Sequence, residues 1–196
     1  MKKLLFVASA LAALSLLAPS SGFAQMADNQ VGIYFDLDAT VVENAPTSTV
    51  PFNAYLIITQ PVDNFGADVT MVEGFECMIS FSNGAAVFKL GETLPPNTVN
   101  IGDATNPANG LDYAAGFGTP IPVVNDMVSV LTLQLMVISV EENFIYVGNS
   151  TLGNMYYGEA ENATLVDFYP SSGDQATPCA AIAPVSDITP VESETW

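Results

Sequence analysis

The chain has 196 residues, of which 49% are hydrophobic, and its 21 Asp and Glu against three Lys and Arg give a formal net charge of −18. Nucleic acids and anionic lipid headgroups are bound through Lys and Arg, so this charge disfavours both kinds of partner. The sequence contains no His, which excludes Ser-His and Cys-His nucleophile pairs and a zinc site built on imidazole.

Residues 1–24 are predicted to be a secretion signal. Lys2 and Lys3 form a basic start, residues 4–17 are apolar, and Gly-Phe-Ala at 22–24 is a small-x-small cleavage site. The apolar stretch is shorter than the roughly 20 residues that span a bilayer. We therefore expect a secreted protein, extracellular or periplasmic, that does not insert into the membrane after signal removal and keeps Lys89 as its one cationic side chain.

Short runs of alternating apolar and polar residues follow the signal, and Gly, Pro, Asn and Asp separate them. This pattern predicts strands. The clearest runs are 31–36, 50–60, 74–81, 85–90, 127–139, 144–147 and 164–169, with shorter candidates at 98–101, 111–117 and 121–124. So many short strands in one domain predict an all-β fold, a two-sheet antiparallel sandwich of jelly-roll or immunoglobulin-like type with about nine strands.

Two local features refine this prediction. In residues 127–139, the side chains predicted for each of the two faces of a strand are largely apolar. This is typical of a strand in the middle of a sheet. Asn83-Gly84 stands between two apolar runs, and this dipeptide favours the positive φ angles of a tight hairpin. We expect a two-residue hairpin there.

The domain is predicted to comprise residues 25–170, with an acidic, Pro- and Ser-rich tail at 171–196. Cys77 and Cys179 are an even pair in an exported chain, which predicts one disulfide between them. The alternative is a buried thiol at Cys77 and a loose one in the tail.

Catalysis is not expected, because without His and Arg the chain lacks the usual general bases and oxyanion clamps. A calcium ion is a possible cofactor, since hard cations are bound by several oxygen ligands. The best candidate ligands lie in the loop 102–112 and are Asp103, Thr105, Asn109 and Asp112. The stretch lacks the acid spacing of an EF-hand, and an ordinary surface loop is the alternative reading.

Tyr156 and Tyr157 lie in a predicted loop and could stack on the rings of a carbohydrate ligand. Aromatic residues in a sandwich are otherwise usual in the core or in cross-strand pairs. Sugar binding through these two side chains is therefore a second functional hypothesis.

Three stretches in sequence order, Pro51 to Ile58, Val72-Glu73-Gly74-Phe75-Glu76 and Asp126 to Leu133, resemble cohesin-like modules of bacterial extracellular proteins. The resemblance covers roughly residues 31–147 and implies a nine-stranded jelly-roll sandwich. It departs from the family after the Gly-Phe-Glu strand, where Phe-Ser-Asn-Gly at 81–84 replaces the usual Asp-Pro.

From these observations we expect a noncatalytic secreted interaction or structural module that docks to an extracellular protein or assembles at a cell surface. The alternatives are a carbohydrate-binding module, whose partner would be a polysaccharide, and a calcium-stabilised adhesion domain. Each would act through exposed loops or a sheet face rather than through reactive side chains.

Overall fold

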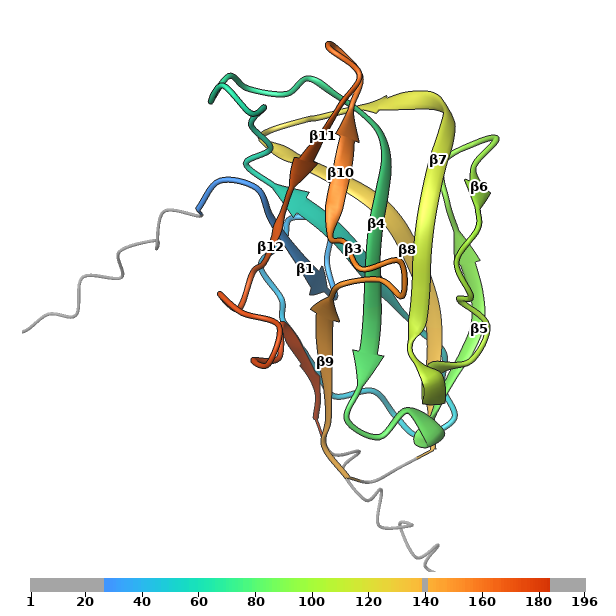
Figure 1. Ribbon diagram of the computed structural model, residues 1–196. Coiled ribbons are helices and arrows are strands. Elements are labelled where there is room, and N and C mark those ends of the chain that lie inside the picture. The colour runs from blue at the N-terminus through green and yellow to red at the C-terminus, as the bar shows by residue number, and fades with distance from the viewer. Residues whose placement is uncertain (1–26, 139–140, 184–196) are drawn as a thin grey trace, which may run out of the picture.

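The computed structural model describes residues 27–138 and 141–183, so the predicted signal peptide and the last thirteen residues lie outside the described part. Two β-sheets pack face to face around one core (Figure 1). The all-β sandwich predicted from the sequence is confirmed. No helix among the described residues is long and apolar enough to cross a membrane.

The first sheet has five strands in the order β12-β1-β3-β8-β5. Their bounds are β1 Gln30–Tyr34, β3 Phe52–Thr59, β5 Val87–Thr93, β8 Met127–Val137 and β12 Tyr169–Pro170. Neighbours are antiparallel except for β1 and β12, which pair in parallel.

The second sheet has eight strands, with β11-β10-β4-β9-β13-β2 on one path and β7 and then β6 on the other side of β4. Their bounds are β2 Glu43–Asn44, β4 Met71–Phe81, β6 Val99–Asn100, β7 Leu111–Pro122, β9 Asn143–Gly148, β10 Tyr156–Glu159, β11 Thr164–Asp167 and β13 Ala180–Ile182. β2 and β13 pair in parallel, so both sheets are mixed rather than purely antiparallel. Two short 3-10 turns, η2 Gly84–Ala86 and η3 Pro107–Asn109, close one end of the sandwich.

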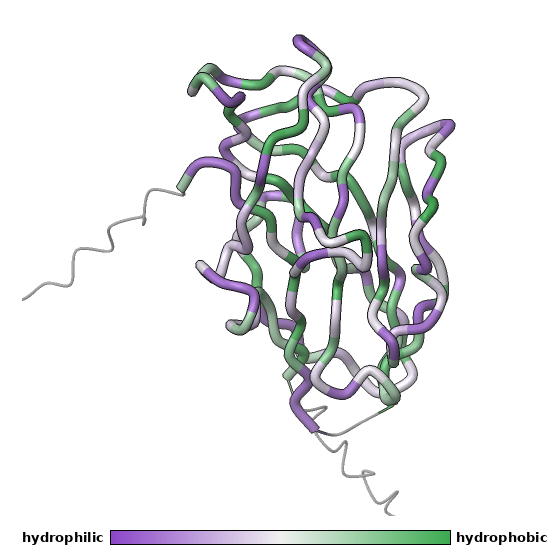
Figure 2. The backbone as a smooth tube through the Cα atoms, in the orientation of Figure 1, coloured by the Kyte–Doolittle hydropathy of each residue, from purple (hydrophilic) through white to green (hydrophobic). Residues whose placement is uncertain are grey.

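Inward side chains of both sheets form the core, and hydrophobic and polar stretches alternate along the strands (Figure 2). β3 contributes Ala54, Leu56 and Ile58, as its alternation predicted. Burial of such a set supplies the main stabilising free energy, about 25 cal/mol for each Å² of apolar surface removed from water.

β8 lies between β3 and β5, as predicted for a central strand. Its two apolar faces have a different cause from the one that we inferred. The pairing with β3 shifts by one residue between Ser129 and Leu131, and the buried set changes from Val128 and Val130 to Leu131, Leu133 and Leu135. A β-bulge shifts the alternation of inward and outward residues by one position. The sequence of a strand with one core-facing side therefore shows apolar residues in both alternating sets.

The Asn83-Gly84 hairpin prediction is wrong. β4 and β5 belong to different sheets, and the connection is the turn η2, before which Asn83 has a negative φ of −134°. Gly84 is needed for a different reason: a Cβ there would lie 2.2 Å from the carbonyl oxygen of Pro107. A tight two-residue turn occurs instead at Asn125 and Asp126, whose φ angles are 52° and 59° and which lie between the bridged residues Val124 and Met127.

The predicted boundary at residue 170 is also too early. The Ser171 N–H donates to Val31 O, and β13 adds to the second sheet between β9 and β2. Backbone pairing therefore includes residues up to 183 in the domain. The sequence did not reveal β2, β10 or β13 as strands because each has four residues or fewer.

The predicted disulfide is absent, because Cys77 and Cys179 are both free thiols and both buried. Cys77 lies in β4, whereas the Cys179 N–H donates to Ile145 O of β9. β9 thus separates the two segments, and two strand spacings amount to about 10 Å, beyond the roughly 7 Å between Cα atoms that a disulfide can bridge.

Candidate functional site

A row of three glycines crosses the outer face of the eight-stranded sheet. Gly158 of β10 pairs with Gly74 of β4, and Gly74 pairs with Gly116 of β7. The row ends at Leu165 of β11 and at Val99 of β6. Since glycine has no side chain, the sheet is hollowed along this line.

Exposed apolar side chains border the hollow. Val99, Ile101, Leu152 and Leu165 are between 59% and 76% exposed, and the last three line a groove of about 470 Å³ with the glycine row. Large apolar side chains gathered around one hollow are unusual on a monomeric surface and mark a place where another molecule can bind. We call this region, with the glycine row as its floor, the glycine groove.

A buried carboxylate lies beside the floor. Glu76 of β4 is only 3% exposed although it points to the outer face, and it accepts hydrogen bonds from the hydroxyls of Ser150 and Tyr156. The bond to Glu76 raises the pKa of Tyr156. The bond to Glu76 holds the Tyr156 side chain at the edge of the groove, and the Tyr156 residue pairs with Asp167 of β11 along the sheet.

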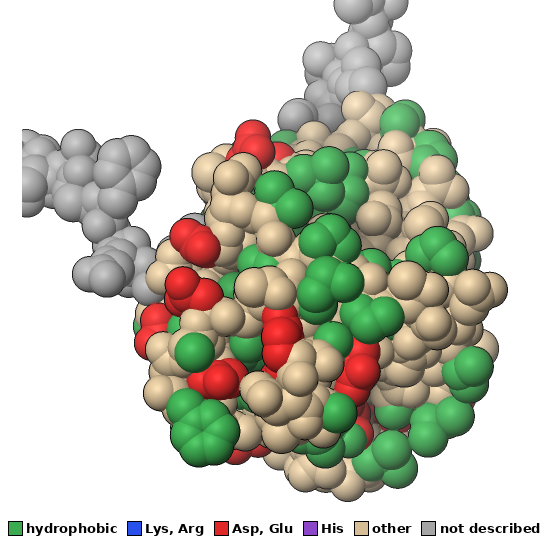
Figure 3. Space-filling view, turned by 90° about the horizontal axis from the view of Figure 1, so that it is seen from above, with side chains coloured by type: hydrophobic (Ala, Val, Ile, Leu, Met, Phe, Trp, Pro, Cys, Tyr) green, Lys and Arg blue, Asp and Glu red, His purple; other side chains and the backbone are tan. Residues whose placement is uncertain are grey.

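The charge around the groove is negative. Glu73 lines it together with Glu76, and Asp167 is exposed at its edge. Lys89, the one cation among the described residues, lies elsewhere and is held by Glu92. At the end of the sandwich where the β10–β11 turn projects, carboxylates also lie among apolar side chains and no Lys or Arg is seen (Figure 3). A ligand of this surface therefore meets apolar contacts flanked by acids.

The two tyrosines proposed as a sugar platform have different environments. Tyr157 is fully buried, its ring stacks on Phe168 at 6.2 Å between centroids, and its hydroxyl donates to Asn29 Oδ1 and Val62 O. It is a core residue and cannot stack on a ligand. Tyr156 alone reaches the surface, because adjacent residues of β10 point to opposite faces.

The predicted cation ligands come together only in part. Asp103, Asn109 and Asp112 line one depression of about 350 Å³, and Thr105 does not. Each carboxylate already accepts a hydrogen bond from a hydroxyl group: Asp103 from Thr105 at 2.6 Å, and Asp112 from Thr151. The hydrogen bond from Thr105 lowers the pKa of Asp103. No cluster of three or more Asp, Glu, Cys or His suited to a metal occurs in the described ranges. Calcium binding stays a prediction.

The glycine groove was not predicted from the sequence. Its floor combines one glycine from each of three strands, and the shared register appears only when the strands pair. Gly74 and Gly158 each looked like ordinary strand or loop glycines. The available signal was the set of exposed apolar residues near them, which a single sequence cannot distinguish from core residues.

No protein-family model matches the chain, and no curated protein matches it. Among solved structures, the chain is similar to CaCohA2 from Clostridium acetobutylicum in solution, at 11% identity and a TM-score of 0.50, over 81% of this chain and 91% of that one. CaCohA2 in a complex with a variant of CaDoc0917 gives the same identity and TM-score over 79% and 98%. A cohesin module from a family 33 glycoside hydrolase of Clostridium perfringens has 14% identity and a TM-score of 0.49, over 71% and 88%.

The chain therefore has a cohesin-like sandwich fold. The resemblance inferred from the sequence is confirmed at the level of fold. The strand count differs, since the described residues form thirteen strands, several of them very short, where about nine were expected.

Proposed function

We propose that this chain is a noncatalytic, secreted protein-binding module and that the glycine groove is its binding site. The observation that carries the proposal is the groove itself, a hollow of about 470 Å³ bordered by exposed apolar side chains. The fold is consistent with this role, because a solved structure of the similar CaCohA2 is a complex with another protein.

The partner that fits is a protein surface with an apolar side chain between basic ones. The apolar side chain would lie over Gly74 and Gly116 and displace water from Ile101, Leu152 and Leu165. The basic side chains would face Glu73 and Asp167, and such charge complementarity speeds association and sets orientation. The described surface near the groove contains no cation that would compete for these acids.

A photo-crosslinking side chain at Ile101 tests the proposal in the native culture medium, with the same group at Gln134 as control. Gln134 is exposed but lies on β8 of the opposite sheet. We expect a specific adduct from Ile101 only, with a partner peptide that contains apolar and basic residues. Equal adducts from both positions would contradict the proposed site.

A sugar-binding module is the second candidate, since Tyr156 lines the groove beside Glu76. A saccharide would stack on the Tyr156 ring and hydrogen-bond to Glu73. Soluble polysaccharides that raise the melting temperature of the wild type, but not of Tyr156→Ala, would favour this candidate over a protein partner.

A further inference from the structure

The first sheet has a gap on one side of β8. The residue pairs with β5 end at Thr93 and Thr132, and the next bridge on that side joins Val124 to Met127. Between these two points, no strand of the described chain pairs with β8 on this side. β5 ends at Thr93, and the β-bulge between Ser129 and Leu131 lies within the same stretch of β8.

The backbone of Ser129 faces this gap. Met127 exchanges two backbone hydrogen bonds with Val124, of 2.9 and 3.2 Å, on the side away from β3. Backbone polar groups alternate sides along a strand, so the N–H and C=O of Ser129, two residues on, point to the same side. On the β3 side, Gln60 N donates to Asp126 O at 2.7 Å, which fits the same alternation. An open strand edge of this kind is a template for another strand.

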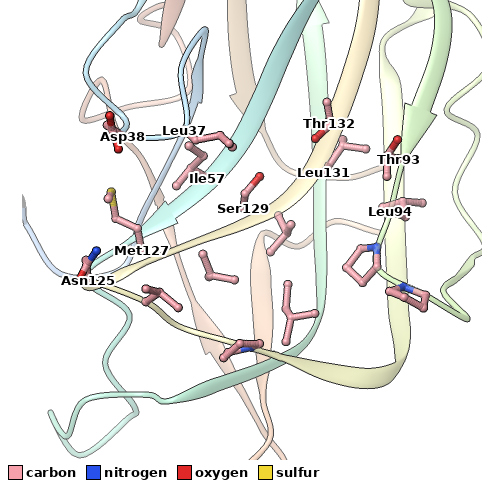
Figure 4. Close-up of a pocket in the computed structure, with 17 residues that line it drawn as sticks. Leu37, Asp38, Ile57, Thr93, Leu94, Asn125, Met127, Ser129, Leu131 and Thr132 are labelled. Carbon is pink, nitrogen blue, oxygen red and sulfur yellow. The ribbon is translucent and has the colours of Figure 1, made fainter.

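An apolar slot of about 510 Å³ runs along the gap. Its walls include Leu94, Pro95 and Pro96 after β5, Ile121 and Pro122 at the end of β7, and Val130 of β8. Figure 4 shows Thr93 and Leu94 across the gap from β8, and Leu37 close to Ile57 at the other end. The prolines carry no N–H, so the wall opposite β8 cannot close the gap by strand pairing at those residues.

The mouth of the slot is acidic. Asp38 lines it next to Leu37, and Asp126 is exposed in the turn before β8. The nearest described cation on this sheet, Lys89, is engaged by Glu92 and Ala104 O. An incoming chain with a basic residue at this end would therefore find a complementary charge.

We propose that the slot binds an extended peptide segment of a partner as an added strand beside β8. The segment would exchange backbone hydrogen bonds with Ser129, place apolar side chains against Leu94 and Ile121, and direct a basic side chain to Asp38. Strand addition uses main-chain bonds for affinity and alternate side-chain pockets for specificity. The slot runs along β8 of the five-stranded sheet and shares no lining residue with the glycine groove.

The test uses the capped hexapeptide Lys-Val-Thr-Val-Thr-Val and the same peptide with proline in place of its central Val. Amide chemical shifts and hydrogen exchange of the whole described domain are followed during titration. We expect shifts confined to residues 37–38, 93–96, 121–124 and 127–132, and at least tenfold slower exchange of the Ser129 amide. The proline peptide should bind at least tenfold more weakly.

Two variants separate the parts of the proposal. Ser129→Pro removes the N–H that faces the gap, and should lose binding while its unfolding midpoint in urea shows that the domain still folds. Asp38→Asn should weaken binding by about two- to fivefold and reduce its salt dependence. Ser129→Ala keeps the N–H and should bind like the wild type.

The proposal is overturned by the absence of shifts at 1 mM peptide, by equal binding of the proline peptide, or by shifts that map to the glycine groove. It is also overturned if the gap is occupied by a second copy of the chain, which would appear as slower diffusion that depends on protein concentration, with protection of Ser129 before peptide is added.

Discussion

Lys89 Nζ lies 2.6 Å from Glu92 Oε2 in a partly buried ion pair, and the same oxygen accepts a hydrogen bond from the hydroxyl of Tyr113 at 2.6 Å. The ammonium group also lies 5.7 Å from the centre of the Tyr113 ring. The pair on β5 thereby reaches Tyr113 of β7, a strand of the other sheet. Lys89, the one cation among the described residues, therefore contributes to a contact that joins the two sheets.

Lys89→Met is expected to destabilise the domain by up to about 1 kcal/mol, because it leaves the Glu92 carboxylate without its cation and solvent screens this partly exposed group. Urea denaturation at pH 7 measures the change. The double variant Lys89→Met with Glu92→Gln should recover part of the loss, and a double variant no more stable than the single one would contradict the pairing argument.

Two glycines of the groove should respond differently to substitution. A Cβ at Gly74 would lie 2.5 Å from the carbonyl oxygen of Ala115, whereas a Cβ at Gly116 meets nothing within 4 Å. Gly74→Ala should therefore cost about 1–3 kcal/mol of stability. Gly116→Ala should leave stability unchanged or raise it by about 0.5 kcal/mol. Thermal melts of the two variants measure this difference. Equal changes in melting temperature would contradict the strand register that places Gly74 against Ala115 and leaves Gly116 open.

The stability that Glu159 contributes should depend on pH. Burial raises the pKa of this carboxyl, but hydrogen bonds from the Asn162 N–H and from Thr164 outweigh burial and leave the pKa below its usual value. A lowered folded-state pKa gives stability that is present above the unfolded pKa and lost as pH falls through the folded one. Wild type should be more stable than Glu159→Gln at pH 7, and the difference should shrink below about pH 4.5. A difference that does not vary between pH 7 and pH 3 would contradict this.

The two thiols should be present and unreactive in the folded protein. Burial raises the pKa of the Cys77 thiol and keeps it protonated, and a protonated thiol is a poor nucleophile. A thiol reagent should titrate almost no cysteine in the native state and two per chain in denaturant. Reductant should leave the melting temperature unchanged. Loss of both thiols, together with a lower melting temperature in reductant, would instead show the disulfide that the sequence suggested.

Most of the fold could be predicted because alternation records which side of a strand is buried, as in Ala54, Leu56 and Ile58 of β3. Prediction failed where one extra residue shifts the register between two strands, and where a strand has very few residues. The bulge at Val130 made one buried side look like two, and β13 has too few residues to show a period. Cys77 and Cys179 were paired by their number, although β9 lies between them.

The candidate site was harder to predict than the fold. Tyr156 and Tyr157 looked equivalent in sequence, yet alternation along β10 puts one at the groove and the other in the core. The floor depends on Gly74, Gly116 and Gly158, which are adjacent only through the register of three strands. Such cross-strand neighbours are set by tertiary pairing, which local sequence does not encode.

The most direct test of the proposed function is a binding titration of the partner captured through Ile101. Gly116→Leu fills the groove from an open position of the floor, and Gln134→Leu places the same side chain on the opposite sheet. The proposal predicts at least tenfold weaker binding for Gly116→Leu and wild-type binding for Gln134→Leu, with both variants folded. Equal affinity of the two variants for the partner would contradict the assignment of the glycine groove as the binding site.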